Sequence, residues 1–161
     1  MSVEDAPRVT VHIPIYLESL DRIEPYLRSA IEAARQYENL YPGKVNLIIS
    51  DDGLMVLAQN DLQGAAENAR RKDLSERSSQ EQELLKRLDY YERNHLTVVA
   101  RPAPDGTPSA ERGGFFKKAG NINYALYLAE AIEEARRNGA DEGQIRSVLS
   151  VDPRWSKGWW R

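Results

Sequence analysis

Residues 45–53 read Val45-Asn46-Leu47-Ile48-Ile49-Ser50-Asp51-Asp52-Gly53, a nearly continuous apolar run that ends in two acids and a glycine. Such a run is typical of a strand that is buried on both faces of a parallel sheet. In an open α/β sheet, ligands bind in the crevice beyond the carboxyl ends of the strands, where Asp51 and Asp52 would lie. An acid there can accept hydrogen bonds from a nucleobase or a ribose hydroxyl. The alternative interpretation is that Asp-Asp-Gly forms a simple turn.

A second informative segment lies further along the chain, at Lys117-Lys118-Ala119-Gly120-Asn121-Ile122-Asn123-Tyr124-Ala125-Leu126. Its apolar spacing predicts that a helix begins here. Free backbone N–H groups and the helix dipole favour a phosphate at such a start, and a lysine adds a positive charge. The alternative is a solvated lysine pair, with Asn121 and Asn123 as capping or solvent-facing residues. Helix starts prefer acids, however, so two lysines without an anion are mildly unfavourable.

The remaining pattern alternates between strands and helices. Strands are predicted at residues 9–15, 45–49, 96–100 and 147–151, and helical stripes at residues 23–34, 84–91 and 119–132. Residues 54–94 are polar and mostly helix-forming, with a capping box predicted at Ser78 and Glu81. Residues 101–114 are rich in proline and glycine and predict a loop. The order implies one α/β domain over residues 1–161, with a Rossmann-like, mostly parallel sheet flanked by helices.

Composition narrows the class of protein. The chain has 161 residues, 41% of them hydrophobic and 29% charged, which fits one soluble globular domain with a real core. A net charge of -3 argues against a dedicated nucleic-acid binder. The absence of cysteine excludes disulfides, thiolate metal sites and thiol nucleophiles. Residues 1–8 contain no apolar signal core, and no stretch reaches the ~20 apolar residues of a membrane helix, so we expect a cytoplasmic location.

Three segments together resemble the nucleotide-sugar-binding half of family-2 glycosyltransferases, which have the GT-A fold. Residues 118–126 look very like the family's Lys-Ala-Gly-x-x-Asn-x-Ala-Leu block. Asp51-Asp52-Gly53 matches the acidic segment after its second strand, and residues 14–18 match its Pro-x-Tyr-x-Glu loop. The resemblance covers about Val9 to Asp152, and it implies a GT-A-like domain that binds a nucleotide-sugar donor, with a UDP-sugar favoured.

The resemblance also implies a set of site residues. Tyr16, Glu18 and Asp52 would surround the nucleoside, Asp51 would support them, and Lys118 would lie near the diphosphate. The full set that it assigns to the nucleotide sugar is Pro14, Tyr16, Glu18, Asp51, Asp52, Lys118, Asn121 and Asn123. The catalytic residue stays unassigned, because the family's acidic general base has no counterpart here.

The resemblance also implies a divalent metal ion at the diphosphate. Family-2 enzymes carry an Asp-x-Asp whose two acids hold Mg²⁺ or Mn²⁺ against the diphosphate. Here the corresponding residues are Asp152-Pro153-Arg154, so one carboxylate remains and an arginine replaces the other. Mg²⁺ commonly uses one or two carboxylates plus phosphates, which leaves Asp152 as the single candidate ligand. The alternative is that Asp152 simply ends a strand before a proline.

The resemblance ends before the family's acceptor-binding half, which includes the Gln-x-x-Arg-Trp block of processive members. A complete enzyme would transfer a sugar with inversion to a saccharide or lipid-linked acceptor and could be membrane-associated. We expect this chain alone to bind nucleotide weakly and to transfer poorly or not at all. Two other functions stay open: a non-catalytic nucleotide-binding module, and a protein-interaction domain. In the latter, a missing segment or partner would cover Trp155, Trp159 and Trp160.

Overall fold

A three-stranded parallel sheet forms the centre of the domain. The computed structural model describes residues 3–101 and 117–141, and its strands are β1 (Val9–Ile15), β2 (Val45–Asp51) and β3 (Thr97–Val99). Their order is β1-β2-β3, with Val9 opposite Val45, Ile15 opposite Asp51, and Ile48 opposite Thr97. The predicted α/β class, with a parallel sheet flanked by helices in a Rossmann-like arrangement, is confirmed.

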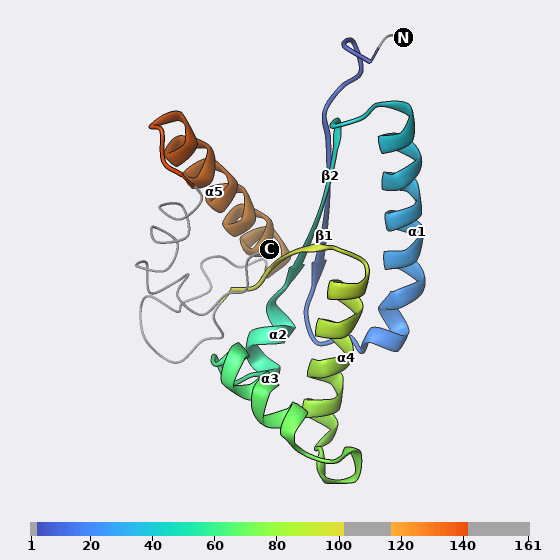
Figure 1. The fold of residues 1–161 in the computed structure, drawn as a ribbon, viewed down its shortest axis with the longest axis vertical. Coiled ribbons are helices and arrows are strands. Elements are labelled where there is room, and N and C mark those ends of the chain that lie inside the picture. Colours follow the sequence, from blue (N-terminus) through green and yellow to red (C-terminus); the bar gives the residue numbers. More distant parts are fainter. Residues whose placement is uncertain (1–2, 102–116, 142–161) are drawn as a thin grey trace.

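Helices cover both faces of this sheet. They are α1 (Leu20–Leu40), α2 (Asp52–Leu57), α3 (Leu62–Arg71), the short 3₁₀ helix η1 (Leu74–Glu76), α4 (Ser79–Arg93) and α5 (Lys117–Arg137). Figure 1 shows α1 and α5 on opposite sides of the strands, with α2, α3 and α4 gathered below. The strands run downward in this view, so their carboxyl ends point toward the α2 to α4 layer.

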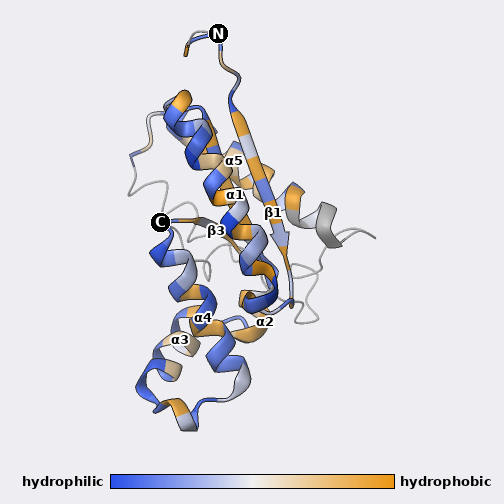
Figure 2. Cartoon of the chain, turned by 90° about the vertical axis from the view of Figure 1, so that its right-hand side faces the viewer, coloured by the Kyte–Doolittle hydropathy of each residue, from blue (hydrophilic) through white to orange (hydrophobic). Residues whose placement is uncertain are grey.

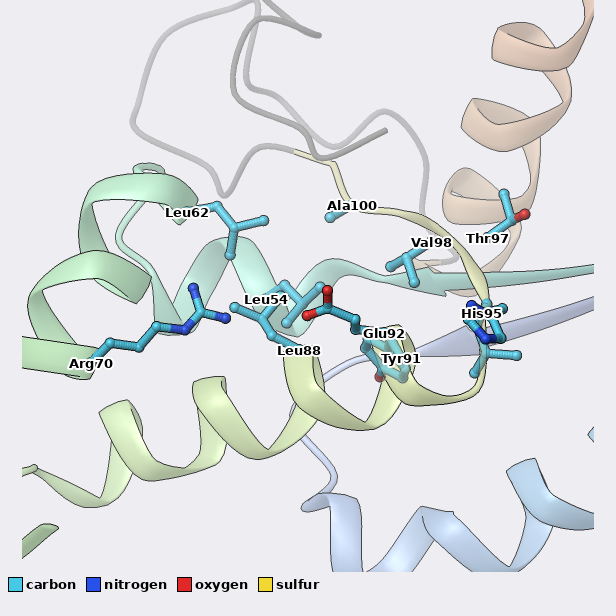
Figure 3. A pocket seen from close by; sticks show the side chains of 11 residues that line it. Leu54, Leu62, Arg70, Leu88, Tyr91, Glu92, His95, Thr97, Val98 and Ala100 are labelled. Atoms are coloured by element: carbon cyan, nitrogen blue, oxygen red, sulfur yellow. The ribbon is translucent and has the colours of Figure 1, made fainter. Parts of the chain in front are cut away.

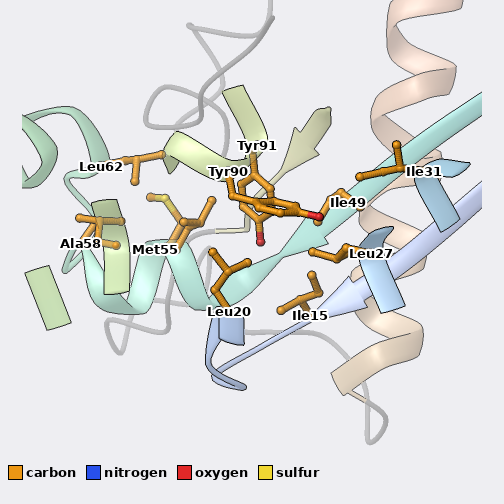
Figure 4. Close-up of a cluster of buried hydrophobic side chains, with 12 residues drawn as sticks. Ile15, Leu20, Leu27, Ile31, Ile49, Met55, Ala58, Leu62, Tyr90 and Tyr91 are labelled. Carbon is orange, nitrogen blue, oxygen red and sulfur yellow. The ribbon is translucent and has the colours of Figure 1, made fainter. Parts of the chain in front are cut away.

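The interior contains two hydrophobic cores, one on each face of the sheet, because successive side chains of a strand point to opposite faces. Ile15 of β1 and Ile49 of β2 face the larger core, which α1, α2, α3 and α4 complete (Figure 4). Val99 of β3 packs instead with Ala125 and Leu128 of α5 on the other face. The central strand is therefore covered on both sides, which explains why residues 45–49 are almost all apolar.

Most predicted elements are found where the pattern placed them. The strand at residues 9–15 and the helix start at Lys117 match β1 and α5. The capping box is confirmed, since the Glu81 amide N–H donates to Ser78 Oγ and the Ser78 N–H donates to Glu81 Oε2. Residues 54–94 resolve into α2, α3, η1 and α4. The third strand is shorter than predicted, and the loop predicted at 101–114 and the strand predicted at 147–151 lie almost wholly or wholly outside the described residues.

The outer surfaces of the helices are polar. Figure 2 shows hydrophilic residues over much of the visible side of α4, while hydrophobic and hydrophilic residues alternate along β1. Among the helices in residues 3–101 and 117–141, none combines the length and apolar character that a membrane crossing requires.

The packing of α1 gives a first prediction. Leu27 is 1% exposed in the core, whereas Leu40 at the end of the same helix is 66% exposed. We expect Leu27→Ala to lower the free energy of unfolding by about 2–5 kcal/mol, because it removes buried methyl groups and leaves a cavity. Leu40→Ala is the matched control and should change it by less than about 0.5 kcal/mol. Urea denaturation of both variants measures this, and equal losses would contradict the placement of α1.

Candidate functional site

The two acids stand at a direct junction between a strand and a helix. Asp51 is the last residue of β2 and Asp52 is the first residue of α2. Asp51 caps α2, since the Gly53 amide N–H donates to Asp51 Oδ1 at 2.9 Å. The alternative interpretation as a simple turn is therefore wrong. The strand ends and the helix begins between the two acids, and their carboxylates have different partners.

Asp51 lies at the centre of a buried hydrogen-bond network. Arg87 Nη1 lies 2.9 Å from both of its carboxylate oxygens, and the Tyr91 hydroxyl donates to Oδ2 at 2.7 Å. With the Gly53 N–H, donors reach both oxygens, and this arrangement stabilises the ionised carboxylate. Burial raises the pKa of Asp51, while Arg87, Tyr91 and Gly53 act against this shift by stabilising the carboxylate.

Arg87 joins three separate parts of the chain. Its side chain is 1% exposed, and besides Asp51 it donates from Nη1 to the Tyr16 carbonyl at 3.0 Å and from Nη2 to the Glu18 carbonyl. Its Nε donates to Glu83 Oε1 at 2.9 Å. Burial acts to lower the pKa of Arg87, but the Asp51 and Glu83 carboxylates outweigh it, and the pKa is raised. The guanidinium therefore stays charged at every physiological pH.

The loop after β1 touches the acidic junction directly. A Cβ placed on Gly53 would lie 1.7 Å from the Tyr16 carbonyl oxygen and 2.7 Å from Arg87 Nη1. Only glycine fits between the loop and the junction, because any side chain would force the backbone of one of them to move. The structure therefore brings the loop at residues 16–18 into contact with the junction at residues 51–53.

Asp52 has a partner of its own. It is 3% exposed and is held by Arg101, which is 6% exposed and follows β3. Arg101 Nη2 and Nε lie 2.5 Å and 3.0 Å from Asp52 Oδ2, and the Arg101 backbone N–H donates to Oδ1 at 3.2 Å. A carboxylate and a guanidinium thus stand together where β2 and β3 end.

The remaining predicted site residues fall into two groups. Pro14 and Tyr16 are partly buried at the end of β1 and just beyond it, and exposed Glu18 accepts a hydrogen bond from the Tyr16 N–H at 2.9 Å. Asn123 is exposed on α5, which packs against β1 and β2. Lys118 and Asn121 lie in the first turns of α5, but their side chains are outside the described part of the structure, as is all of Asp152.

A metal centre has no described counterpart. Within residues 3–101 and 117–141, no three His, Cys, Asp or Glu side chains gather as a metal site would require. The prediction for Mg²⁺ or Mn²⁺ depends on Asp152, which the described residues do not include.

Arg87 and Arg101 were missed by the sequence reasoning. For Arg87 a signal exists: it stands three residues after Leu84 and four before Tyr91, which places it on the apolar stripe of α4 rather than on the solvent side. An arginine on such a stripe, with Glu83 four residues before it, indicates a buried ion pair. For Arg101 the sequence offers no comparable signal.

A separate cavity of about 320 Å³ lies between α3, α4 and β3. Figure 3 shows Leu54, Leu88 and Val98 directed into it, with Arg70 at one end and His95 at the other. The Tyr91 ring forms part of its wall, while the Tyr91 hydroxyl reaches Asp51. The cavity therefore adjoins the buried network at Tyr91.

Comparison of the chain with protein families, with curated proteins and with solved structures found no match in any of the three. What the structure supports directly is a small α/β domain with a three-stranded parallel sheet.

The close approach at Gly53 gives a second prediction. We expect Gly53→Ala to lower the free energy of unfolding by about 3 kcal/mol or more, because the added methyl group meets a fixed carbonyl. Gly64→Ala is the matched control: its Cβ would meet only the side chain of Asp61, so the expected cost is the lost helix cap, about 1 kcal/mol. Thermal and urea unfolding compare the two, and equal losses would refute the contact.

The Tyr91 hydroxyl gives a prediction about alkaline pH. Burial, then the Asp51 carboxylate, raises its pKa above the usual 10.0. A raised folded-state pKa contributes stability that is complete below pH 10 and is lost as the pH rises further, because only the unfolded chain then ionises.

Wild-type stability should therefore fall faster than that of Tyr91→Phe above pH 10, by at most about 1.4 kcal/mol per pH unit. Urea denaturation at pH 8 to 11 measures the two slopes. Parallel curves would mean that the Tyr91 hydroxyl is not buried against Asp51.

Proposed function

We propose that this domain binds the nucleoside diphosphate part of a nucleotide sugar at the carboxyl edge of its sheet, with a UDP-sugar as the favoured donor for inverting glycosyl transfer. The observation that carries the proposal is the direct contact between the Tyr16–Glu18 loop and the Asp51–Gly53 junction. Both segments follow parallel strands at the edge where ligands of open α/β sheets bind.

The chemistry of this edge suits a nucleoside. The Asp52 carboxylate can accept hydrogen bonds from the imide N–H of uracil or from a ribose hydroxyl, which a buried acid does strongly. Tyr16 adds an aromatic ring, and Glu18 adds an exposed carboxylate beside it. In the structure Arg101 donates hydrogen bonds to Asp52, and we expect a bound base to take over part of that hydrogen bonding.

The same edge also carries positive charge for a diphosphate. Arg101 stands beside Asp52, and a guanidinium can pair with phosphate oxygens in a bidentate manner. α5 begins at Lys117 and packs on β1 and β2, and Figure 1 shows its beginning, the positive end of its dipole, near the carboxyl ends of the strands. The proposal therefore assigns the nucleoside to residues 16–18 and 52, and the diphosphate to Arg101 and the start of α5.

Calorimetric titration with UDP, with and without Mn²⁺, tests the proposal. We expect the wild-type chain to bind UDP and Asp52→Asn to bind it much more weakly, because the amide carries no charge and replaces one of the two acceptor oxygens with an NH₂ donor. Asp89→Asn is the control, since Asp89 is an exposed acid on α4 with a long 3.8 Å ion pair to Arg70. Thermal unfolding verifies that each variant is folded.

Two outcomes would contradict the assignment: no binding by the wild-type chain at millimolar UDP, or equal affinities of the wild type and Asp52→Asn. Enhancement of binding by Mn²⁺ would indicate a transferase donor site that works with Asp152. Binding that ignores Mn²⁺ would favour a non-catalytic nucleotide-binding module instead.

A further inference from the structure

One buried side chain with several long-range hydrogen bonds lies outside the set of residues that the resemblance assigned to the nucleotide. Arg87 of α4 is enclosed, yet its donors reach Asp51, Glu83 and the carbonyl groups of Tyr16 and Glu18. These two carbonyls belong to the loop between β1 and α1, which contains no regular structure of its own. The guanidinium supplies hydrogen bonds that this loop cannot make internally.

Glu83 fixes the same loop at its far end. Its Oε1 accepts from Arg87 Nε at 2.9 Å and also from the backbone N–H of Leu20, the first residue of α1, at 2.7 Å. The pair Glu83 and Arg87, one turn apart on α4, therefore spans the loop from Tyr16 to Leu20. Since both side chains are held at several points, they fix where the loop lies relative to α4.

Arg87 also fixes the acidic junction. Its bonds to both oxygens of Asp51 set the end of β2, and Asp52 follows directly in the chain. The Tyr16 carbonyl that Arg87 binds is the group that faces Gly53. One side chain thus sets the distance between the segment that carries Tyr16 and Glu18 and the segment that carries Asp52.

We propose that Arg87 is a positioning residue for nucleotide binding: it touches no ligand, and it holds the nucleoside-contacting loop at a fixed position against the acidic junction. This inference depends on the proposed function, because the loop and the junction are its nucleoside-binding segments. A buried arginine is required for this role. Lysine offers one ammonium group, which cannot bond the carboxylate and two carbonyls in the fixed fork geometry of a guanidinium.

The test compares two variants of α4 that both lose stability. Arg87→Lys removes the guanidinium group and its several hydrogen bonds. Leu84→Ala truncates a fully buried core side chain on the same helix and leaves the Arg87 guanidinium in place. UDP affinity is measured by calorimetry well below the melting temperature of each variant. We expect the dissociation constant of Arg87→Lys to rise by about 10- to 100-fold, the range typical of residues that orient the ligands of a metal site, and that of Leu84→Ala to stay unchanged.

Hydrogen–deuterium exchange separates a local effect on the loop from a general loss of stability. In Arg87→Lys the amides of residues 16–20 should exchange faster than the loss of global stability accounts for, and in Leu84→Ala they should not. If Arg87→Lys does not fold, Glu83→Gln is the milder variant, which weakens the hold on Arg87 Nε and the Leu20 N–H. Its UDP affinity should then fall in the same direction by a smaller factor.

The outcomes separate the two proposals. If the wild-type chain binds UDP and a folded Arg87→Lys, or Glu83→Gln in its place, binds equally well, the positioning role is overturned while the proposed function stands. Equal losses of affinity in Arg87→Lys and Leu84→Ala would also overturn it, because affinity would then follow stability alone. If the wild-type chain fails to bind UDP, the proposed function is refuted first and the positioning role with it.

Discussion

The packing of this domain depends on the buried ion pair between Arg87 and Asp51. Both side chains are almost completely enclosed, and a buried charge without a partner is strongly destabilising, by about 3–5 kcal/mol when one member is removed. The pair is tolerated because Tyr91, Gly53, Glu83 and two loop carbonyls complete its hydrogen bonds. Those bonds in turn require α4, the loop after β1 and the end of β2 to meet at one point.

The direct junction between β2 and α2 explains how two adjacent acids come to have different partners. Asp51 points into the α4 side of the sheet, where its bonds hold the structure together. Asp52 belongs to the neighbouring helix start and pairs with Arg101 beyond β3, at the edge that we assign to the nucleotide. The register of β2 with β1 places Asp51 opposite Ile15 and so fixes the point at which the strand ends and the helix that carries Asp52 begins.

The sequence predicted those parts of the fold that depend on local periodicity. The strands at 9–15 and 45–49, the capping box at Ser78 and Glu81, and the helix starting at Lys117 follow from spacing and capping chemistry, and the structure confirms them. The direct strand–helix junction at Asp51 and Asp52 was not predictable in the same way, because Asp-Asp-Gly is equally typical of turns. The burial of Arg87 and Arg101 depends on partners far away in the chain, which periodicity does not reveal. The nucleotide assignment of Tyr16, Glu18 and Lys118 stays a prediction.

The connection between Arg87 and the loop after β1 also has a consequence for how the chain folds. Its bonds join residues that are 71, 69 and 36 positions apart. Contacts of such long range form late, because closing long loops costs entropy before any contact is gained. During synthesis the amino-terminal segment emerges first, so β1, α1 and β2 have to wait for α4 before Asp51 can be neutralised. A chain that ends before residue 87 therefore lacks the guanidinium that pairs with Asp51, and its β2–α2 junction cannot be buried at low cost. We expect such incomplete chains to stay partly unfolded and to be substrates of chaperones and proteases.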